Sequence, residues 1–512
     1  MSAGPEQAGR TTLVPMPTPH RDPEARTDPR CTWRIPDDRR LPALEPFADD
    51  VRRHEPVVLR ETVWDSEDRV LAAEGVELLR SDAGWSVDRG DGPVAVGPDL
   101  DDDGVGSDDG VGSAEQPPRD TVEVFLRGRQ LRVVRVRDTA TTLVELRGRD
   151  GRLRAEVADV RVDEGDPDTA LLRSARWWAL SDDGSAGSVA RAAERALADA
   201  AEPAAAGGGR SPEHGRPRPA RPEPVRRGGT SKRPRRGTAA AALREVLRSL
   251  RADLVAVDPR VRADERESVH DFRKVLRRLR SVLAAYRGAL DRGATEVLRA
   301  ELAGVARVAG VARDAEVLRD RLLRTAARAP EGFVDAGTLD RIGAHVEGAR
   351  AAAAAELRRT LRSPAWASSL DHLDDLVERA PRGPHADDDA AAFAVHRIRK
   401  ERDRVAGTLG GRVEGLDDLH EVRKTARRLR YALQAAGDRP DLGKRRLGFL
   451  KRLQESLGEV LDAAHATAAY RDLAGPAAQR GEDTFGHGAL ATTEHAVLEQ
   501  AWGRARKLLA KA

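Results

Sequence analysis

The sequence predicts an α+β protein of several domains, with an antiparallel β-barrel in its N-terminal part and an all-α C-terminal domain. Three observations support this prediction. The chain has 512 residues, more than one domain usually holds. Short apolar runs separated by turns fill residues 31–183, whereas helical periods fill residues 239–512. The second region also repeats one helix, which predicts two pseudo-repeated helical bundles.

The N-terminal region alternates apolar and polar residues over short runs. Predicted strands include residues 122–126, 131–136, 142–146 and 155–160. The last two flank the turn sequence Arg149-Asp150-Gly151, which is typical of a hairpin. Several such hairpins favour an antiparallel sheet or barrel. The preceding residues 1–30 are rich in Pro, Thr and charge, and we expect them to be disordered.

Residues 184–238 connect the two domains. They contain one short predicted helix at 188–200, and then a segment rich in Pro, Gly and Arg that excludes regular structure. This segment is either a solvated spacer or an auxiliary arm that binds a polyanion. From residue 239 to 512 the strand pattern is absent, and Pro and Gly gather at a few predicted breaks, one of them at 258–259.

Composition excludes several classes of protein. The formal net charge is only +3, so a polyanion site must come from local placement of cations. Aromatic residues make up 3% of the chain, which disfavours recognition of nucleic-acid bases. The single cysteine, Cys31, allows neither an internal disulfide nor a cysteine-based metal site. Because signal-peptide and membrane-spanning patterns are absent, we expect a cytoplasmic protein without membrane contact.

One helix occurs twice in the C-terminal domain. Residues 269–286 and 419–436 are identical at nine of eighteen positions and share the frame H-x-x-R-K-x-x-R-R-L-R. In each copy the apolar residues recur every three or four positions, which predicts one buried stripe. The two stripes are Val269, Phe272, Leu276, Leu279, Leu283 and Tyr286, and Leu419, Val422, Ala426, Leu429, Leu433 and Ala436.

The cations of each copy lie on roughly the opposite side of the helix. Like charges on one helical face repel each other by a few tenths of a kcal/mol per pair. They are either neutralised by acids of adjacent helices or held by a partner that carries phosphates, which Arg, Lys and His can all bind. The repeated histidine favours phosphate. Catalysis is disfavoured because no nucleophile, Gly-rich loop or zinc motif accompanies the histidines, and we predict no catalytic or metal-binding residues.

Each copy is followed by an aspartate at a similar distance. Asp314 lies 44 residues after His270, and Asp462 lies 42 residues after His420. These carboxylates either cap or cross-brace helices, or they orient the basic side chains.

The repeated frame and the following segment from Leu453 to Asp462, L-x-x-x-x-G-x-x-x-D, resemble the CHAD domain, the conserved histidine α-helical domain. The resemblance covers about 240–510 and implies two pseudo-symmetric helical bundles that bind inorganic polyphosphate. It further implies a protein targeted to polyphosphate granules. Carried over by position, the polyphosphate-binding residues would be His270, Arg273, Lys274, Arg277, Arg278, His420, Arg423, Lys424, Arg427, Arg428 and Lys451.

Residues 31–183 resemble, more weakly, the CYTH domain, a triphosphate-tunnel barrel. The similar segments are Trp33 to Pro36, Gly75 to Arg80 and Leu153 to Val162. The family's Glu-x-Glu-x-Lys signature is absent, since residues 28–32 read Asp-Pro-Arg-Cys-Thr. This departure predicts a degenerate barrel without catalysis and without a cofactor, Mg²⁺ being needed only if activity is retained. The alternative function is a metal-dependent CYTH-type triphosphatase acting on tripolyphosphate or nucleoside triphosphates.

Overall fold

The computed structural model describes residues 30–100, 116–169, 171–182, 187–201, 237–411, 413, 415–437 and 444–510, with side chains omitted at 444–446. Most of the N-terminus, of the acidic run at 99–110 and of the Pro/Gly/Arg-rich linker lies outside these ranges. Contacts divide the chain into two compact units. We call residues 1–62 and 135–221 the sheet unit, and residues 63–134 and 222–512 the helical unit.

The sheet unit is built from antiparallel strands and one helix. Its strands are paired in the order β1-β9-β8-β7-β3, with β2 on β7. Buried residues of the strands, among them Val144, Val157 and Trp178, form a core with Leu197 of the helix. The elements are β1 (Cys31–Ile35), β2 (Asp50–Arg53), β3 (Val57–Asp65), β7 (Arg132–Arg147), β8 (Leu153–Gly165), β9 (Leu172–Asp182) and α3 (Ser188–Ala201).

The predicted hairpin at 149–151 is confirmed. Gly151 turns the chain with a φ of +72°, a conformation that favours glycine, and Val144 then pairs with Val157. The predicted strands 131–136 and 142–146 are parts of one strand, β7, because the polar residues between them continue the pairing with β8. The predicted short helix at 188–200 is α3.

The predicted antiparallel sheet is confirmed, but within the described residues it does not close into a barrel. The complete strand order runs β1-β9-β8-β7-β3-β4-β5-β6, with β3 crossing the boundary between the units. The end strand β1 pairs with β9, and the other end strand β6 pairs with β5. In the described part of the chain these two end strands do not pair with each other, so the sheet is open.

The N-terminal segment of the helical unit contains three short strands and two short α-helices. One predicted strand, 122–126, is wrong, because Glu123–Leu126 is a helical turn, α2. Val124, Phe125 and Leu126 are all buried, which the alternating sides of a half-exposed strand would not allow. The elements are α1 (Val70–Glu74), β4 (Glu77–Ser81), β5 (Gly84–Asp88), β6 (Pro93–Val96) and α2 (Glu123–Leu126).

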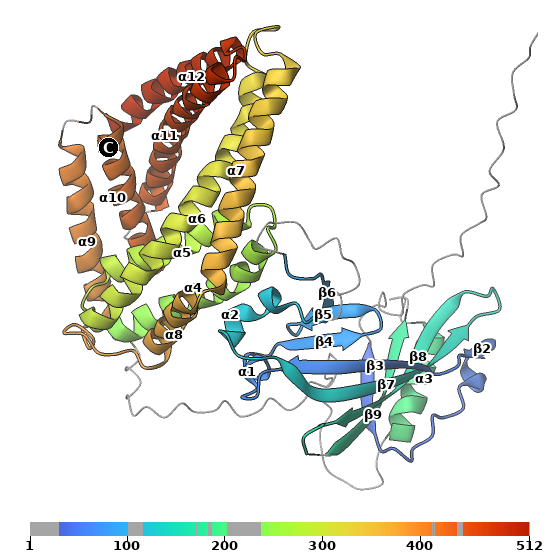
Figure 1. Ribbon diagram of the computed structural model, residues 1–512. Coiled ribbons are helices and arrows are strands. Elements are labelled where there is room, and N and C mark those ends of the chain that lie inside the picture. Colours follow the sequence, from blue (N-terminus) through green and yellow to red (C-terminus); the bar gives the residue numbers. More distant parts are fainter. Residues whose placement is uncertain are drawn as a thin grey trace, which may run out of the picture. The chain divides into compact units, whose positions relative to one another are not determined.

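The rest of the helical unit is all-α, as predicted (Figure 1). The hairpins α6–α7 and α11–α12 are formed by its longest helices, and Figure 1 shows them side by side. The predicted break at 258–259 is wrong, since Pro259 lies inside the last turns of α4. The helices are α4 (Ala239–Arg262), α5 (Ser268–Ala285), α6 (Arg292–Ala326), α7 (Ala336–Arg362), α8 (Pro364–Glu378), α9 (Ala390–Leu409), α10 (Leu416–Ala435), α11 (Lys444–Gln479) and α12 (Phe485–Leu509).

Residues 63–134 belong to the helical unit through a shared core and through ion pairs. Leu71, Leu78 and Phe125 lie in the same apolar cluster as Leu247 and Leu276. Residues 63–134 must therefore be included in the protein used for any experiment that requires a folded helical unit. Within the described residues, no helix combines the length and hydropathy that crossing a bilayer requires.

Among the described residues, four arginines form ion pairs between this segment and the helices, and we call them the paired arginines: Arg127, Arg251, Arg262 and Arg362. The best buried is Arg262, whose side chain is 1% exposed. It donates to Asp258 at 2.5 Å, to Asp120 at 3.3 Å and to the Leu361 carbonyl at 2.6 Å. Burial alone lowers the pKa of the Arg262 guanidinium, but Asp258 and Asp120 outweigh burial and raise it.

The other paired arginines also contact carboxylates. Arg362 bonds Asp120 at 2.6 Å. Arg127 and Arg251 share Asp374, at 2.5 Å and 2.6 Å respectively. Every paired arginine therefore has at least one carboxylate within hydrogen-bonding distance, as buried cations require.

Candidate functional site

The two copies of the repeated helix form α5 and α10, which pack against each other. The predicted apolar stripes are buried in both copies, apart from the partly buried Ala436 at the end of the second. A hydrogen bond of 2.8 Å from the Tyr286 hydroxyl to the Ala432 carbonyl links the two helices. Burial of the stripes also fixes the rotation of each helix, because the stripe must face the core.

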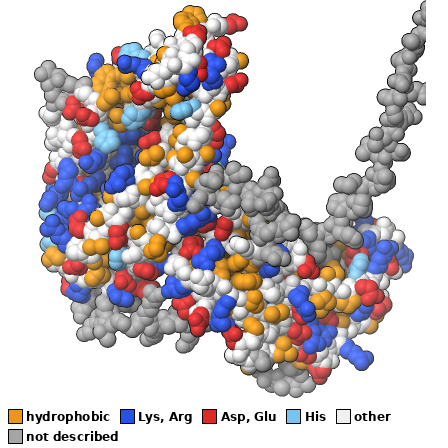
Figure 2. All heavy atoms as spheres, in the orientation of Figure 1, with side chains coloured by type: hydrophobic (Ala, Val, Ile, Leu, Met, Phe, Trp, Pro, Cys, Tyr) orange, Lys and Arg blue, Asp and Glu red, His pale blue; other side chains and the backbone are white. Residues whose placement is uncertain are grey.

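The opposite faces of α5 and α10 bring four arginines together. We call Arg273, Arg277, Arg423 and Arg427 the basic cluster. The charge of Arg427 is destabilised by Arg277, Arg423 and Arg273, and that of Arg423 by Arg273, so these guanidiniums are close neighbours. Figure 2 shows Lys and Arg side chains gathered in one area of the helical unit, where Figure 1 draws α9 and α10. The two repeats thus contribute to one common site.

The cluster is short of negative charge. Within the part of the chain that the structure describes, Arg273 has a carboxylate within 4 Å, whereas no carboxylate ion-pairs with Arg277, Arg423 or Arg427. Burial, followed by Arg277 and Arg423, lowers the pKa of Arg427 to about 9. The pKa of Arg277 is also lowered, first by burial, and its Nε is buried without a hydrogen-bond partner. Keeping these partly buried guanidiniums charged without a neighbouring anion costs free energy, and a bound anion would reduce that cost.

A glycine and an aspartate follow each basic helix at equivalent positions. Arg273 donates to the Gly310 carbonyl at 3.2 Å and pairs with Asp314 at 3.0 Å. In the second copy, a Cβ on Gly458 would lie 3.0 Å from Nη2 of Arg423, so glycine leaves room for the guanidinium. The long helices α6 and α11 therefore orient one arginine in each repeat.

Asp462 has the equivalent position in the second copy but is more buried than Asp314. Burial raises its pKa, although Arg423 and Arg321 act in the opposite direction. Asp314 also acts electrostatically on Arg423, across the boundary between the repeats. Of the two alternatives left open by the sequence, this placement supports the orienting one.

The two predicted histidines have different surroundings. His270 is half-buried, and burial, followed by Arg313 and Arg277, lowers its pKa from the ordinary value of 6.5. The imidazole is therefore neutral at pH 7 and can donate one hydrogen bond. His420, at the same position of α10, is exposed.

The remaining predicted residues are more peripheral, and most are paired. Lys424 pairs with Glu421 at 3.0 Å, and Lys451 approaches Glu455 at 3.8 Å. Arg278 lies 3.7 Å from Asp253. Lys274 is exposed, and no acid of the described residues ion-pairs with it.

Arg428 has a partner of a different kind. It bonds Glu401 at 2.6 Å and the Ala284 carbonyl at 2.9 Å. Glu401 is 1% exposed, so this pair helps to hold α9, α10 and α5 together.

Sequence reasoning missed the contribution of α9. This helix packs on α10 and carries Arg397, Arg399, Lys400 and Arg404 within eight residues. Arg399 and Lys400 are exposed, and no carboxylate ion-pairs with either of them in the described part of the chain. The high density of cations in residues 397–404 could have predicted a basic helix. It was missed because α9 lies outside the repeated frame.

The sheet unit holds its inner cations differently. Arg137 pairs with Glu164 at 2.8 Å and lies 3.8 Å from Glu61, and Arg135 pairs with Glu164 at 3.3 Å. Like the paired arginines, and unlike most of the basic cluster, Arg135 and Arg137 each have an ion-paired carboxylate. In the described residues, no three His, Cys, Asp or Glu side chains gather in a way that suits a metal ion.

Comparison with known families agrees with the geometry of α5 and α10. Residues 241–471 match the family model of the CHAD domain. This part of the chain is a CHAD domain. The match spans both repeats, the basic cluster, and the Gly and Asp positions of α6 and α11. The CYTH resemblance of residues 31–183 stays a prediction.

Relatives extend the comparison. Two uncharacterized proteins, each from a strain of Mycobacterium tuberculosis, are 30% identical over 256 residues. The matched part is 48% of this chain and 48% of each relative, so the chain spans about half the length of the curated relatives it matches.

Two solved structures are also similar to the chain. PptA from Streptomyces chartreusis has a TM-score of 0.44 at 20% identity, covering 53% of this chain and 99% of that one. The CHAD domain from the plant Ricinus communis has a TM-score of 0.43 at 22% identity, covering 54% and 93%.

Proposed function

We propose that the CHAD domain of this chain binds inorganic polyphosphate through the basic cluster and the cations around it. The observation that carries the proposal is the convergence of four arginines from two repeats with a single ion-paired carboxylate, Asp314, among the described residues. A bound anion would replace the missing carboxylates. Each charge-assisted hydrogen bond to it would contribute on the order of 1.5–3 kcal/mol.

A chain of phosphates suits the site better than a single phosphate. The cluster bridges α5 and α10, and further exposed cations lie on α5 at Lys274 and on the neighbouring helix α9 at Arg399 and Lys400. Successive charges along one flexible ligand could contact all of them, and the gain from each contact would then add to one association. The same binding would place the protein on polyphosphate granules.

Nucleic acid also presents phosphates, but the site offers little for bases. The aromatic ring beside the cluster, Tyr431, is 3% exposed. The exposed aromatic side chains of the described residues are Phe333, in the turn after α6, and Phe485, at the start of α12. Base stacking requires an accessible ring, so we expect polyphosphate to bind more tightly than DNA at equal charge.

The test measures binding of long-chain polyphosphate to the full-length protein and to a variant with Arg273, Arg277, Arg423 and Arg427 all replaced by Glu. We expect the charge reversal to abolish binding at physiological salt while the far-ultraviolet circular dichroism is unchanged. The full chain is used because residues 63–134 share the core of the helices.

Matched controls make the outcome specific. Reversing Arg319 and Arg359, two exposed arginines of the same unit that are paired with Asp320 and Glu356, should leave binding within about twofold, because exposed pairs contribute little. Binding to duplex DNA that equals or exceeds binding to polyphosphate at matched charge concentration would overturn the proposal.

A further inference from the structure

One elongated cavity of the helical unit lies away from the basic cluster. It has a volume of about 810 Å³ and is bordered by the turn after α6 and by α11 and α12. None of the eleven predicted polyphosphate-binding residues lines it. Along α12 it extends from Gly488 to Arg504, about 24 Å at the rise of an α-helix, so the cavity is elongated.

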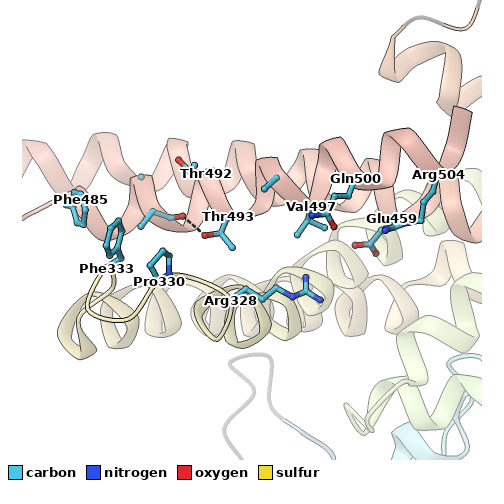
Figure 3. Close-up of a pocket in the computed structure, with 13 residues that line it drawn as sticks. Arg328, Pro330, Phe333, Glu459, Phe485, Thr492, Thr493, Val497, Gln500 and Arg504 are labelled. Carbon is cyan, nitrogen blue, oxygen red and sulfur yellow. Dashed lines mark hydrogen bonds between the residues drawn. The ribbon is translucent and has the colours of Figure 1, made fainter.

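One end of the cavity is aromatic. The rings of Phe333 and Phe485 are 5.3 Å apart, and Pro330 lies beside them (Figure 3). The side chains are 45% and 58% exposed, and they are the large exposed aromatic side chains of the described residues. In a chain that is 3% aromatic, two exposed rings at one cavity indicate a surface that an apolar group covers.

The other end of the cavity is charged. Figure 3 shows Glu459 and Arg504 there, with the guanidinium of Arg328 between them and the aromatic end. Glu459 already pairs with Arg321 at 3.3 Å. Within the described residues, Arg328 and Arg504 are exposed and have no ion-paired carboxylate. Because Arg321 also pairs with Glu494 at 2.5 Å, these three arginines and two glutamates leave one net positive charge at this end.

The middle of the cavity is weakly polar. Ala489, Ala496 and Val497 line it, together with Thr493, whose hydroxyl already donates to the Ala489 carbonyl at 2.8 Å. The exposed side chains of Thr492 and Gln500 also line it, but these are neutral donors and do not replace the hydration of a polyphosphate chain, which disfavours polyphosphate as the occupant. An alkyl chain would lose no hydrogen bonds.

We propose that this cavity binds a single-chain amphiphile with an anionic head group, such as a fatty acid or an alkyl phosphate. The alkyl chain would lie against Phe333, Phe485 and Val497, and the head group would contact Arg328 and Arg504. The proposal does not depend on polyphosphate binding, because the two sites share no residue.

The experiment titrates the full-length protein by calorimetry with dodecanoate, dodecyl phosphate and dodecyltrimethylammonium, each below its micellar concentration. We expect both anions to bind and the cation to bind at least tenfold more weakly, because the two arginines select the sign of the head group. The ratio of dodecanoate to dodecyl phosphate affinity distinguishes a carboxylate from a phosphate ligand. Excess polyphosphate should leave the titrations with the two anionic amphiphiles unchanged.

Variants locate the ligand. Replacing Phe333 and Phe485 by Ala should weaken dodecanoate binding about tenfold, because apolar contact area is lost. Replacing Leu323 by Ala, a residue 76% exposed on α6 outside the cavity, should have no effect. Arg328→Gln with Arg504→Gln should remove the preference for anions, whereas Arg324→Gln, one turn before Arg328, should keep it.

Three outcomes would overturn the proposal. One is the absence of dodecanoate binding by a protein whose circular dichroism shows it to be folded. Another is equal affinity for the cationic and anionic amphiphiles. The third is a wild-type protein that sediments as a dimer while the Phe333→Ala and Phe485→Ala variant sediments as a monomer with unchanged dodecanoate affinity. The aromatic pair would then be a contact between copies of the chain.

Discussion

The basic cluster and the paired arginines are two groups of buried or half-buried guanidiniums in one unit, yet their surroundings differ. Arg262 has Asp258 and Asp120 beside it, and its pKa is raised. Arg427 has Arg277 and Arg423 beside it, and its pKa is lowered to about 9. The first arrangement is complete as folded, whereas the second remains deficient in negative charge. Burial alone therefore does not distinguish a structural arginine from a candidate binding arginine. The charge of the neighbouring side chains does.

The largest expected effect comes from removing two charges of the cluster. We expect Arg277→Gln with Arg427→Gln to weaken polyphosphate binding about 100-fold or more, since two charge-assisted contacts are lost. The free energy of unfolding in urea should stay equal or rise, because mutual repulsion is relieved. A marked loss of stability would show that these arginines are structural, like the paired ones.

The paired arginines should behave in the opposite way. Arg262→Met is expected to lower the free energy of unfolding by about 3–5 kcal/mol, because Asp258 and Asp120 lose their partner in a buried place. Polyphosphate affinity of the folded fraction should be unchanged. Chemical denaturation and a binding titration below the transition measure both quantities, and a variant as stable as the wild type would contradict this view of Arg262.

Protonation of His270 should make the polyphosphate affinity of the basic cluster depend on pH. Its pKa is lowered by burial, by Arg313 and by Arg277, while Glu267 and Asp271 act in the opposite direction. A bound phosphate favours the protonated imidazole, so binding takes up a proton and the affinity rises as the pH falls through the pKa. We expect polyphosphate affinity to increase about threefold to tenfold from pH 7.5 to 5.5.

Two histidine variants test that assignment. His270→Gln should flatten the pH dependence, whereas His345→Gln, an exposed histidine on α7, should leave it as it is. An unchanged pH dependence in the His270 variant would remove His270 from the site.

The smallest expected effect concerns the sheet unit, where Arg135 and Arg137 are already paired with Glu164. We expect no metal-dependent release of phosphate from tripolyphosphate above the rate in buffer alone. A robust rate that Glu156→Gln abolishes would contradict this expectation and favour the triphosphatase alternative.

Much of the helical unit could be predicted because its signals are local. Stripes such as Phe272 to Leu283 fix the helices and their buried faces, and the repeated frame with its histidine predicted that cations share one face. The strand predicted at 122–126 was wrong, because four buried apolar residues in five fit a helical turn in a shared core equally well. The apolar pattern of a short segment does not show which other elements pack against it.

Ion pairing could not be predicted for the same reason. Arg428 and Arg427 are adjacent in one motif, but only the fold places Glu401 of α9 against Arg428. The sequence likewise contains Gly310 and Gly458 without showing that an arginine from another helix lies over each. Contacts between distant elements, rather than helix periods, decide which cations remain available.

We propose that unneutralised charges of the basic cluster hold the polyphosphate chain, and the salt dependence of binding is the most direct test of this role. By analogy with single-stranded nucleic acids, each phosphate contact should add about 0.7 to the slope of log K against log salt concentration. The Arg277→Gln and Arg427→Gln variant should therefore show a slope smaller than that of the wild type by about 1.4. An unchanged slope would mean that the phosphates are bound elsewhere and would contradict the account.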